Sequence, residues 1–189
     1  MGSAAVSYPS VTQIIPSDFS KVKPDVLEAA ALRGKLAHNA LRLYALGAYD
    51  PNPLPYDVQP YFDSGRRWFD EYVDTVMWVE AEFVHPLYLY TGHPDLVAIL
   101  RGNSLPSVID YKTPEQYMER QWVAQLVSYT KMIEAQEKIT LGPGVDVRLR
   151  GDGRPARANP VRDPETAWNG FLNALGAFNY FGLAVGGKT

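Results

Sequence analysis

Two apolar runs joined by a short turn place the strongest constraint on how this chain folds. The runs are Leu96–Leu100 and Val108–Lys112, and a Gly-Asn pair at 102–103 lies between them. Glycine and asparagine tolerate the backbone angles of a tight turn, so the segment predicts a β-hairpin or a closely paired set of strands. Side chains two residues apart on a strand share a face. Asp110 and Lys112 are therefore expected to point the same way.

Charged residues gather at one end of this predicted pair of strands. Asp95 precedes the first run, and strand pairing can bring it beside Asp110 and Lys112. Two carboxylates and an ammonium at one sheet end form the arrangement that holds a hard divalent cation against a phosphate. The alternative for the aspartates is a turn cap or surface charge. For Lys112 it is an ion pair that only neutralises Asp110. The pattern favours a site for phosphoryl chemistry.

The composition sets limits on the class of protein. The chain has 189 residues, 46% of them hydrophobic and 21% charged, which predicts one domain over 1–189 with flexible ends at 1–9 and 182–189. No apolar run approaches the roughly 18 residues of a membrane span, and no secretory signal is recognisable. Cysteine is absent, which excludes disulfides, zinc sites built on thiolates and iron–sulfur clusters. We expect a cytoplasmic protein.

The remaining segments alternate between helical and extended patterns. Helices are predicted over 24–46, 61–73 and 113–136, and a last one is predicted from Asp163 onward. A strand is predicted over 76–84, and a late hairpin at 145–161 turns at Gly151-Asp-Gly153. Strands mixed with helices of this length predict an α/β fold, with a central mixed sheet of about four to five strands flanked by helices.

Four short motifs follow one another between Ser10 and Lys138. They are Arg33-Gly-Lys-Leu-Ala-His38, Gly92-His-Pro-Asp95, Asp110-Tyr-Lys-Thr113 and Gln125-Leu-Val-Ser-Tyr129. In this order they resemble the RGxxxH, GxxD, DYKT and QLxxY elements of the PD-(D/E)XK nuclease superfamily, in its RecB-like exonuclease branch. The resemblance implies a restriction-endonuclease-like core, with N-terminal helices forming one wall of the cleft.

The resemblance also implies a metal site. His38, Asp95, Asp110 and the carbonyl of Tyr111 would bind one or two Mg²⁺ or Mn²⁺ ions, without an iron–sulfur cluster. A nitrogen ligand would shift the preference towards Mn²⁺. Lys112 would orient or activate the attacking water, or stabilise charge on the phosphoryl group. His85 and His93 compete with His38 for a role at the metal, and a lone histidine in a helix is more often not a ligand.

Other residues receive roles from the same resemblance. Glu80 is expected to contact the metal directly or through water, in preference to Glu82 on the same strand. Gln125 and Tyr129 would support the lysine or touch the scissile strand, although one polar helix face can also be only a solvated face. Candidate nucleic-acid contacts are Arg33, Lys35 and Gln121, with ordinary surface exposure as the alternative for each.

The function implied is a metal-dependent deoxyribonuclease, and most directly an exonuclease that works from DNA ends, including single-stranded ones. A structure- or sequence-specific endonuclease with the same active site is the first alternative. A DNA-binding module that no longer cuts is the second. The net charge of −3 does not indicate a protein that coats DNA, and it is neutral towards a nuclease. A recombination or phage protein is an expected partner, and a phage source suits the short chain.

Overall fold

The computed structural model describes residues 8–17, 22–50, 53–113 and 118–182. Most of the ends that were predicted to be flexible lie outside these ranges. The elements are, in chain order, α1 (Val11–Ile14), α2 (Pro24–Ala45), α3 (Gln59–Tyr72), β1 (Val73–Val79), β2 (Phe83–Val84), β3 (Thr91–Gly92), β4 (Leu96–Leu100), β5 (Pro106–Lys112), α4 (Glu119–Glu137), β6 (Val145–Arg148), β7 (Arg157–Pro160) and α5 (Pro164–Phe181).

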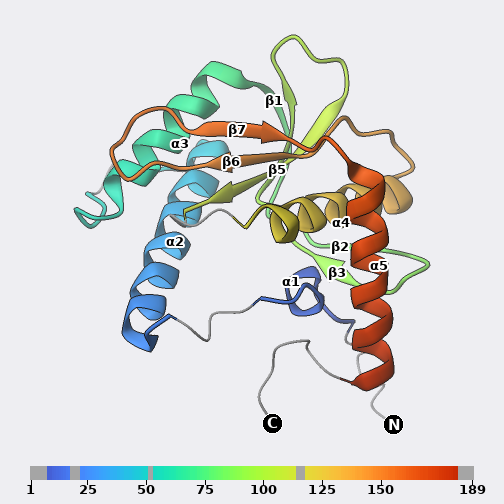
Figure 1. Ribbon diagram of the computed structural model, residues 1–189. Helices are drawn as coiled ribbons and strands as arrows, with labels where there is room; N and C mark the ends of the chain where they lie inside the picture. Colours follow the sequence, from blue (N-terminus) through green and yellow to red (C-terminus); the bar gives the residue numbers. More distant parts are fainter. Residues whose placement is uncertain (1–7, 18–21, 51–52, 114–117, 183–189) are drawn as a thin grey trace, which may run out of the picture.

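A five-stranded sheet forms the centre of the molecule (Figure 1), and its strand order is β1-β4-β5-β6-β7. The β5–β6 pair is parallel, whereas the pairs β1–β4, β4–β5 and β6–β7 are antiparallel. The sheet is therefore mixed, and helices flank it, which confirms the predicted α/β class. Strands β2 and β3 form a separate two-stranded sheet.

Both predicted hairpins are present. Strands β4 and β5 pair with Leu96 opposite Ile109, and Gly102 has a φ of +80° in the turn between them. Strands β6 and β7 pair with Asp146 opposite Asn159, and Gly153 has a φ of +69°. Positive φ is readily adopted by glycine, so turn chemistry located these two connections correctly.

The strand predicted over 76–84 is wrong as a single element. It breaks after Val79, because Glu80 has a φ of +45° and the chain turns there. The Glu80 N–H donates to the Asp95 carbonyl at 3.2 Å, and the chain then enters β2 in the other sheet. The start predicted for the helix at 113 falls beside residues 114–117, which lie outside the described ranges, and α4 begins at Glu119.

Two hydrophobic clusters cover the two faces of the sheet. One joins the sheet to α2 and α3 and includes Leu41, Trp68 and Ile109. The other joins it to α1, α4 and α5 and includes Val108 and Phe171. Consecutive β5 residues enter different clusters, as expected of a strand buried on both faces. Within the described residues, no helix is both long enough and apolar enough to cross a bilayer.

Candidate active site

The charged residues of the first hairpin meet at the end of β5. Asp110 and Lys112 share a face of that strand and form an ion pair. Asp95 directly precedes β4, and its Oδ2 accepts a hydrogen bond from the Tyr111 N–H at 2.6 Å. His38 comes from α2 and places Nδ1 3.2 Å from Asp95 Oδ1. Three segments that are distant in sequence thus bring two carboxylates, an imidazole and an ammonium together.

Helix α4 holds Lys112 from the other side. The Lys112 Nζ donates to Gln125 Oε1 at 2.7 Å, and Gln125 Nε2 donates to the Tyr129 hydroxyl at 3.1 Å. Tyr129 is only 3% exposed, so this face of α4 is not the solvated one that was left open as an alternative. The ring of Trp122 lies 5.8 Å from Lys112 Nζ, a contact with a cation that the sequence did not indicate.

Burial and neighbouring charges shift the acidities of the cluster in different directions. Burial raises the pKa of Asp110 to about 6, although the Lys112 ammonium opposes this shift. Burial also acts to raise the pKa of Asp95, but His38, Tyr111 N–H and Lys112 outweigh it and hold that pKa below its usual value. Burial acts to lower the pKa of His38, and the stronger combined effect of Asp95 and Asp110 raises it. The two carboxylates are therefore chemically distinct.

A cleft of about 520 Å³ opens beside this cluster. Its lining includes Lys35 and His38 from α2, Glu80 from the break after β1, and Tyr111 and Lys112 from the end of β5. Helix α2 therefore forms one wall of the cleft, as the resemblance implied. Glu82 instead lies 4.0 Å from His93 on the surface. Of the two glutamates considered, Glu80 is the one that lines the cleft.

Two predicted nucleic-acid contacts lie elsewhere. The guanidinium of Arg33 lies over the ring of Tyr61, 5.3 Å from its centre, and Arg33 does not line the cleft. Gln121 lines a second cavity instead of that cleft. Lys35 remains exposed in the cleft wall. Helical spacing placed these side chains near the motifs, but it could not show the direction in which each one points.

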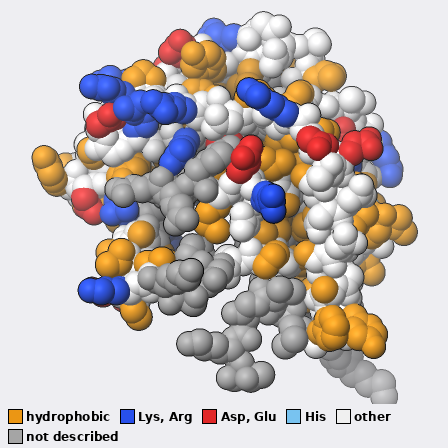
Figure 2. All heavy atoms as spheres, viewed as in Figure 1, with side chains coloured by type: hydrophobic (Ala, Val, Ile, Leu, Met, Phe, Trp, Pro, Cys, Tyr) orange, Lys and Arg blue, Asp and Glu red, His pale blue; other side chains and the backbone are white. Residues whose placement is uncertain are grey.

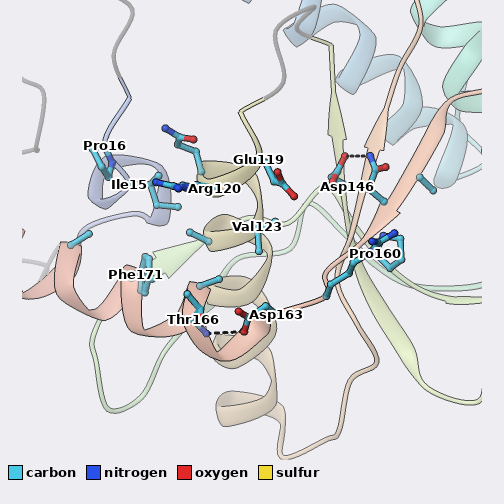
Figure 3. A pocket seen from close by; sticks show the side chains of 18 residues that line it. Ile15, Pro16, Glu119, Arg120, Val123, Asp146, Pro160, Asp163, Thr166 and Phe171 are labelled. Atoms are coloured by element: carbon cyan, nitrogen blue, oxygen red, sulfur yellow. Dashed lines mark hydrogen bonds between the residues drawn. The ribbon is translucent and has the colours of Figure 1, made fainter.

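The second cavity has a volume of about 990 Å³ and lies between α4, α5 and the β6–β7 hairpin (Figure 3). Asp146 lies at its wall, 2% exposed, and accepts a hydrogen bond from Asn159 Nδ2 at 2.8 Å. Burial raises the pKa of Asp146. Asp146 pairs in register with Asp110. Sequence reasoning missed Asp146, although the alternation Val145-Asp-Val-Arg148 already placed it and Arg148 on one face of the strand.

The cluster has the donor types of a site for Mg²⁺ or Mn²⁺, namely carboxylate oxygens with one imidazole. Asp110 is buried, and its Oδ2 forms the ion pair with the Lys112 ammonium. Within the described ranges, no three His, Cys, Asp or Glu side chains are already grouped as a metal site. His38 and Asp95 face one another instead. The types of ligand atom in the cluster therefore suit such a cation. Their present positions are set by hydrogen bonds and ion pairs within the protein.

Comparisons with known proteins give a likeness to solved structures but not to a protein family. No protein-family model matches the chain, and no curated protein matches it either. Among solved structures, the chain is similar to the crystal structure of an alkaline exonuclease (LHK-Exo) from Laribacter hongkongensis. The two share 14% sequence identity, with 91% of this chain and 88% of that chain covered and a TM-score of 0.38.

Proposed function

We propose that this protein is a metal-dependent DNA nuclease that hydrolyses phosphodiester bonds. The observation that carries the proposal is the convergence of His38, Asp95, Asp110 and Lys112 in one cluster. His38 and Lys112 of this cluster line the adjoining cleft. Bringing four titratable groups together in a partly buried cluster does little for stability, since the desolvation of paired charges offsets their attraction. Such a cluster is accounted for by a reaction that needs it.

The resident cation would be Mg²⁺ or Mn²⁺, held by Asp95, Asp110 and His38, with the carbonyl of Tyr111 as a further ligand. When bound, such an ion activates a water molecule and neutralises charge on the phosphoryl group. Each carboxylate oxygen has more than one lone pair, so Asp95 can keep its hydrogen bond from the Tyr111 N–H while it binds a cation. Glu80 lines the same cleft and supplies a further carboxylate.

Lys112 would place a positive charge next to the scissile phosphate. Its position is set from two sides, by the ion pair with Asp110 and by the hydrogen bond to Gln125 Oε1. Gln125 is in turn fixed by Tyr129. A point charge held in this way stabilises developing negative charge without rearrangement during the reaction. Gln125 and Tyr129 are therefore positioning residues for the lysine.

Digestion from DNA ends is the mode that the four motifs support best, through their resemblance to RecB-like exonucleases. Endonuclease cleavage would use the same cluster. The cleft lies between α2 and the end of β5, and the exposed Lys35 is a candidate contact for the substrate backbone. Binding at a DNA end would also suit a protein that acts together with recombination or phage proteins.

The decisive experiment compares end-labelled linear DNA with closed circular DNA in Mg²⁺, Mn²⁺ or EDTA. Wild type is compared with Lys112→Ala and with Lys131→Ala, a matched control because Lys131 lies exposed on α4 in an ion pair with Glu134. Circular dichroism and thermal unfolding establish that each variant is folded. Single-stranded DNA and RNA substrates in parallel define the class of nucleic acid.

We expect linear DNA to be shortened from its ends while circles survive, with no cleavage in EDTA or by Lys112→Ala. If circular DNA is cut at the same rate, the proposed active site stands, but cleavage does not require DNA ends. If folded wild type cuts no substrate with either metal, the proposed nuclease activity is wrong. Equal loss of activity in Lys131→Ala would show that Lys112 has no special role.

A further inference from the structure

The rim of the sheet next to Lys112 has three cations in register. Lys112 is the last residue of β5, Arg148 is the last of β6, and Arg157 is the first of β7. Lys112 pairs with Arg148, and Arg148 pairs with Arg157. Directly opposed residues on neighbouring strands place their side chains on the same face of a sheet. The three cations therefore form a row, here called the rim row, on the face where Lys112 meets α4.

The residues one row further inside have the opposite character. Asp110, Asp146 and Asn159 are also paired in register across β5, β6 and β7. Burial raises the pKa of Asp146, and the hydrogen bond from Asn159 and the charges of Lys112 and Arg148 oppose that shift. Carboxylates and an amide thus occupy the interior, and cations occupy the rim.

Exposure increases along the rim row away from the cluster. Lys112 and Arg148 are half-buried, whereas Arg157 is exposed. Arg157 makes no ion pair with any residue that the structure describes, unlike Arg150 and Arg154 on the adjoining turn, which both pair with Asp152. Figure 2 shows Lys and Arg side chains gathered over the end of β6 and β7 that adjoins the tip of β5. The row thus leads from the cluster to an open, positively charged edge.

The dimensions of the rim row suit one strand of nucleic acid. Neighbouring strands of a sheet lie about 4.8 Å apart, so the row from Lys112 to Arg157 spans roughly 10 Å. A stacked nucleic-acid strand rises about 3.4 Å per nucleotide, so this length corresponds to about three nucleotides. Guanidinium groups bind phosphate oxygens in a bidentate manner, which fixes a backbone more firmly than a lysine does.

We propose that Arg148 and Arg157 bind backbone phosphates of the substrate strand, within about three nucleotides of the phosphodiester at Lys112. This inference rests on the proposed nuclease function and adds the path that the strand takes across β6 and β7. Contacts with the backbone have no base preference, so the rim row serves strands of any sequence. The strand therefore runs across the rim from the cluster towards the β7 edge.

The test measures binding separately from cutting. Fluorescence anisotropy follows a labelled single-stranded 12-mer in EDTA and again in Ca²⁺, between 50 and 200 mM KCl, on wild type, Arg157→Gln, Arg157→Lys and Arg148→Gln. The matched control is Arg101→Gln. Arg101 is exposed, follows β4 at the opposite end of the sheet, and makes no ion pair with described residues. Thermal unfolding checks Arg148→Gln, whose side chain is half-buried, and the exposed Arg157 keeps the test valid if that variant does not fold.

We expect Arg157→Gln to raise the Kd about tenfold at low salt, the loss of one charge-assisted contact of about 1.4 kcal/mol. The slope of log Kd against log salt should fall by about 0.7 for each lost phosphate contact, while Arg157→Lys keeps most of the wild-type slope. Arg101→Gln should change neither quantity.

Two results would overturn the rim row. One is an equal effect, or none, in Arg157→Gln and Arg101→Gln; the other is a wild type that does not bind the oligonucleotide. Failure of the rim row can be told apart from failure of the proposed nuclease activity. DNA cleavage by wild type and by Arg157→Gln with unchanged binding would keep the nuclease and reject the row. Binding that depends on Arg157 without cleavage would keep the row and reject the nuclease.

Discussion

Two histidines, His38 and His85, have different hydrogen-bond partners in two regions of the molecule. His38 lies at the end of the large sheet, where its Nδ1 faces the Asp95 carboxylate at 3.2 Å. His85 lies in the small β2–β3 region, where its Nδ1 accepts hydrogen bonds from the N–H groups of Leu87 and Tyr88, both at 3.2 Å. The ring of His85 stacks 6.1 Å from that of Trp168. One histidine has a charged partner from a distant segment, and the other is satisfied by its own turn.

The pKa values of the two side chains shift in opposite directions. The pKa of His38 is raised, because Asp95 and Asp110 outweigh the effect of burial, whereas burial lowers the pKa of His85. His38 therefore holds a proton more tightly than a free imidazole and lines a cleft. His85 holds a proton less tightly and lies among aromatic rings. Local hydrogen bonding explains His85 as a structural residue. His38 has no such local explanation, and the comparison supports the role proposed for the cluster around it.

The largest expected effect is the loss of DNA cleavage when the charge of Asp110 is removed. Asp110→Asn keeps the size of the side chain but removes the carboxylate that pairs with Lys112. We expect cleavage to fall by at least about a thousandfold, the scale of losing one strong electrostatic contact in an active site. His85→Asn should remain within about twofold of wild type, as a side chain outside the reacting region. Single-turnover cleavage of labelled DNA measures both variants.

A smaller effect concerns the stability of the buried ion pair. Lys112→Met leaves Asp110 buried without its partner, and the free energy of unfolding should fall by about 3 kcal/mol at pH 8. Asp110→Asn combined with Lys112→Met removes both charges and should recover most of that loss. Urea unfolding of the two single variants and the double variant gives the coupling energy. Strictly additive losses would contradict a direct interaction between the two side chains.

The sequence predicted the parts of this site that depend on local pattern. The Gly-Asn turn and the apolar alternation correctly predicted the β4–β5 hairpin and the shared face of Asp110 and Lys112. The late hairpin was predicted for the same reason. His38 was placed at the cluster through the motif resemblance alone, since nothing in helical periodicity shows which distant strand a helix faces.

The remaining features depend on tertiary packing. The residue preferences of 76–84 predict one continuous strand, but the chain turns at Glu80, which has a positive φ. Its N–H donates a hydrogen bond to the Asp95 carbonyl. Arg33 lies over Tyr61 instead of the cleft, since its aliphatic stem and planar charge pack well on an aromatic ring. The parallel pairing of β5 with β6 brings Asp146 and Arg148 beside the cluster, and no local signal specifies that pairing.

A third prediction sharpens the comparison through Gly92 of β3, which belongs to the second region and packs against Tyr129 of α4. A Cβ built on Gly92 would lie 2.4 Å from Tyr129 Cε1. Gly92→Ala should therefore displace Tyr129, lower the free energy of unfolding by about 1–3 kcal/mol and weaken the support of Gln125 for Lys112. Gly170→Ala in α5 is the control, because nothing lies within 4 Å of its Cβ. That variant should gain up to about 1 kcal/mol.

Thermal unfolding and cleavage assays on both glycine variants test this expectation. A fall in cleavage for Gly92→Ala beyond its fall in stability would connect β3 to the lysine through Tyr129. If Gly92→Ala is as stable as wild type, the close approach of β3 to α4 is not as tight as these contacts indicate.

The smallest expected effect is on the pH dependence of stability, and it isolates His85. A histidine whose pKa is lowered in the folded state binds fewer protons there than in the unfolded chain, whose pKa is near 6.5. Its contribution is complete above pH 6.5 and declines as the pH falls below that value. Protonation of Nδ1 would remove the acceptor for the Leu87 and Tyr88 N–H groups.

Between pH 7.5 and 5, the free energy of unfolding of wild type should therefore fall by about 1 kcal/mol more than that of His85→Asn, whose side-chain oxygen remains an acceptor. His93→Asn, at an exposed position, should follow wild type. Urea unfolding gives the free energy of unfolding of each variant across this pH range. If that free energy changes equally with pH in wild type and His85→Asn, His85 does not differ in protonation between the folded and unfolded states.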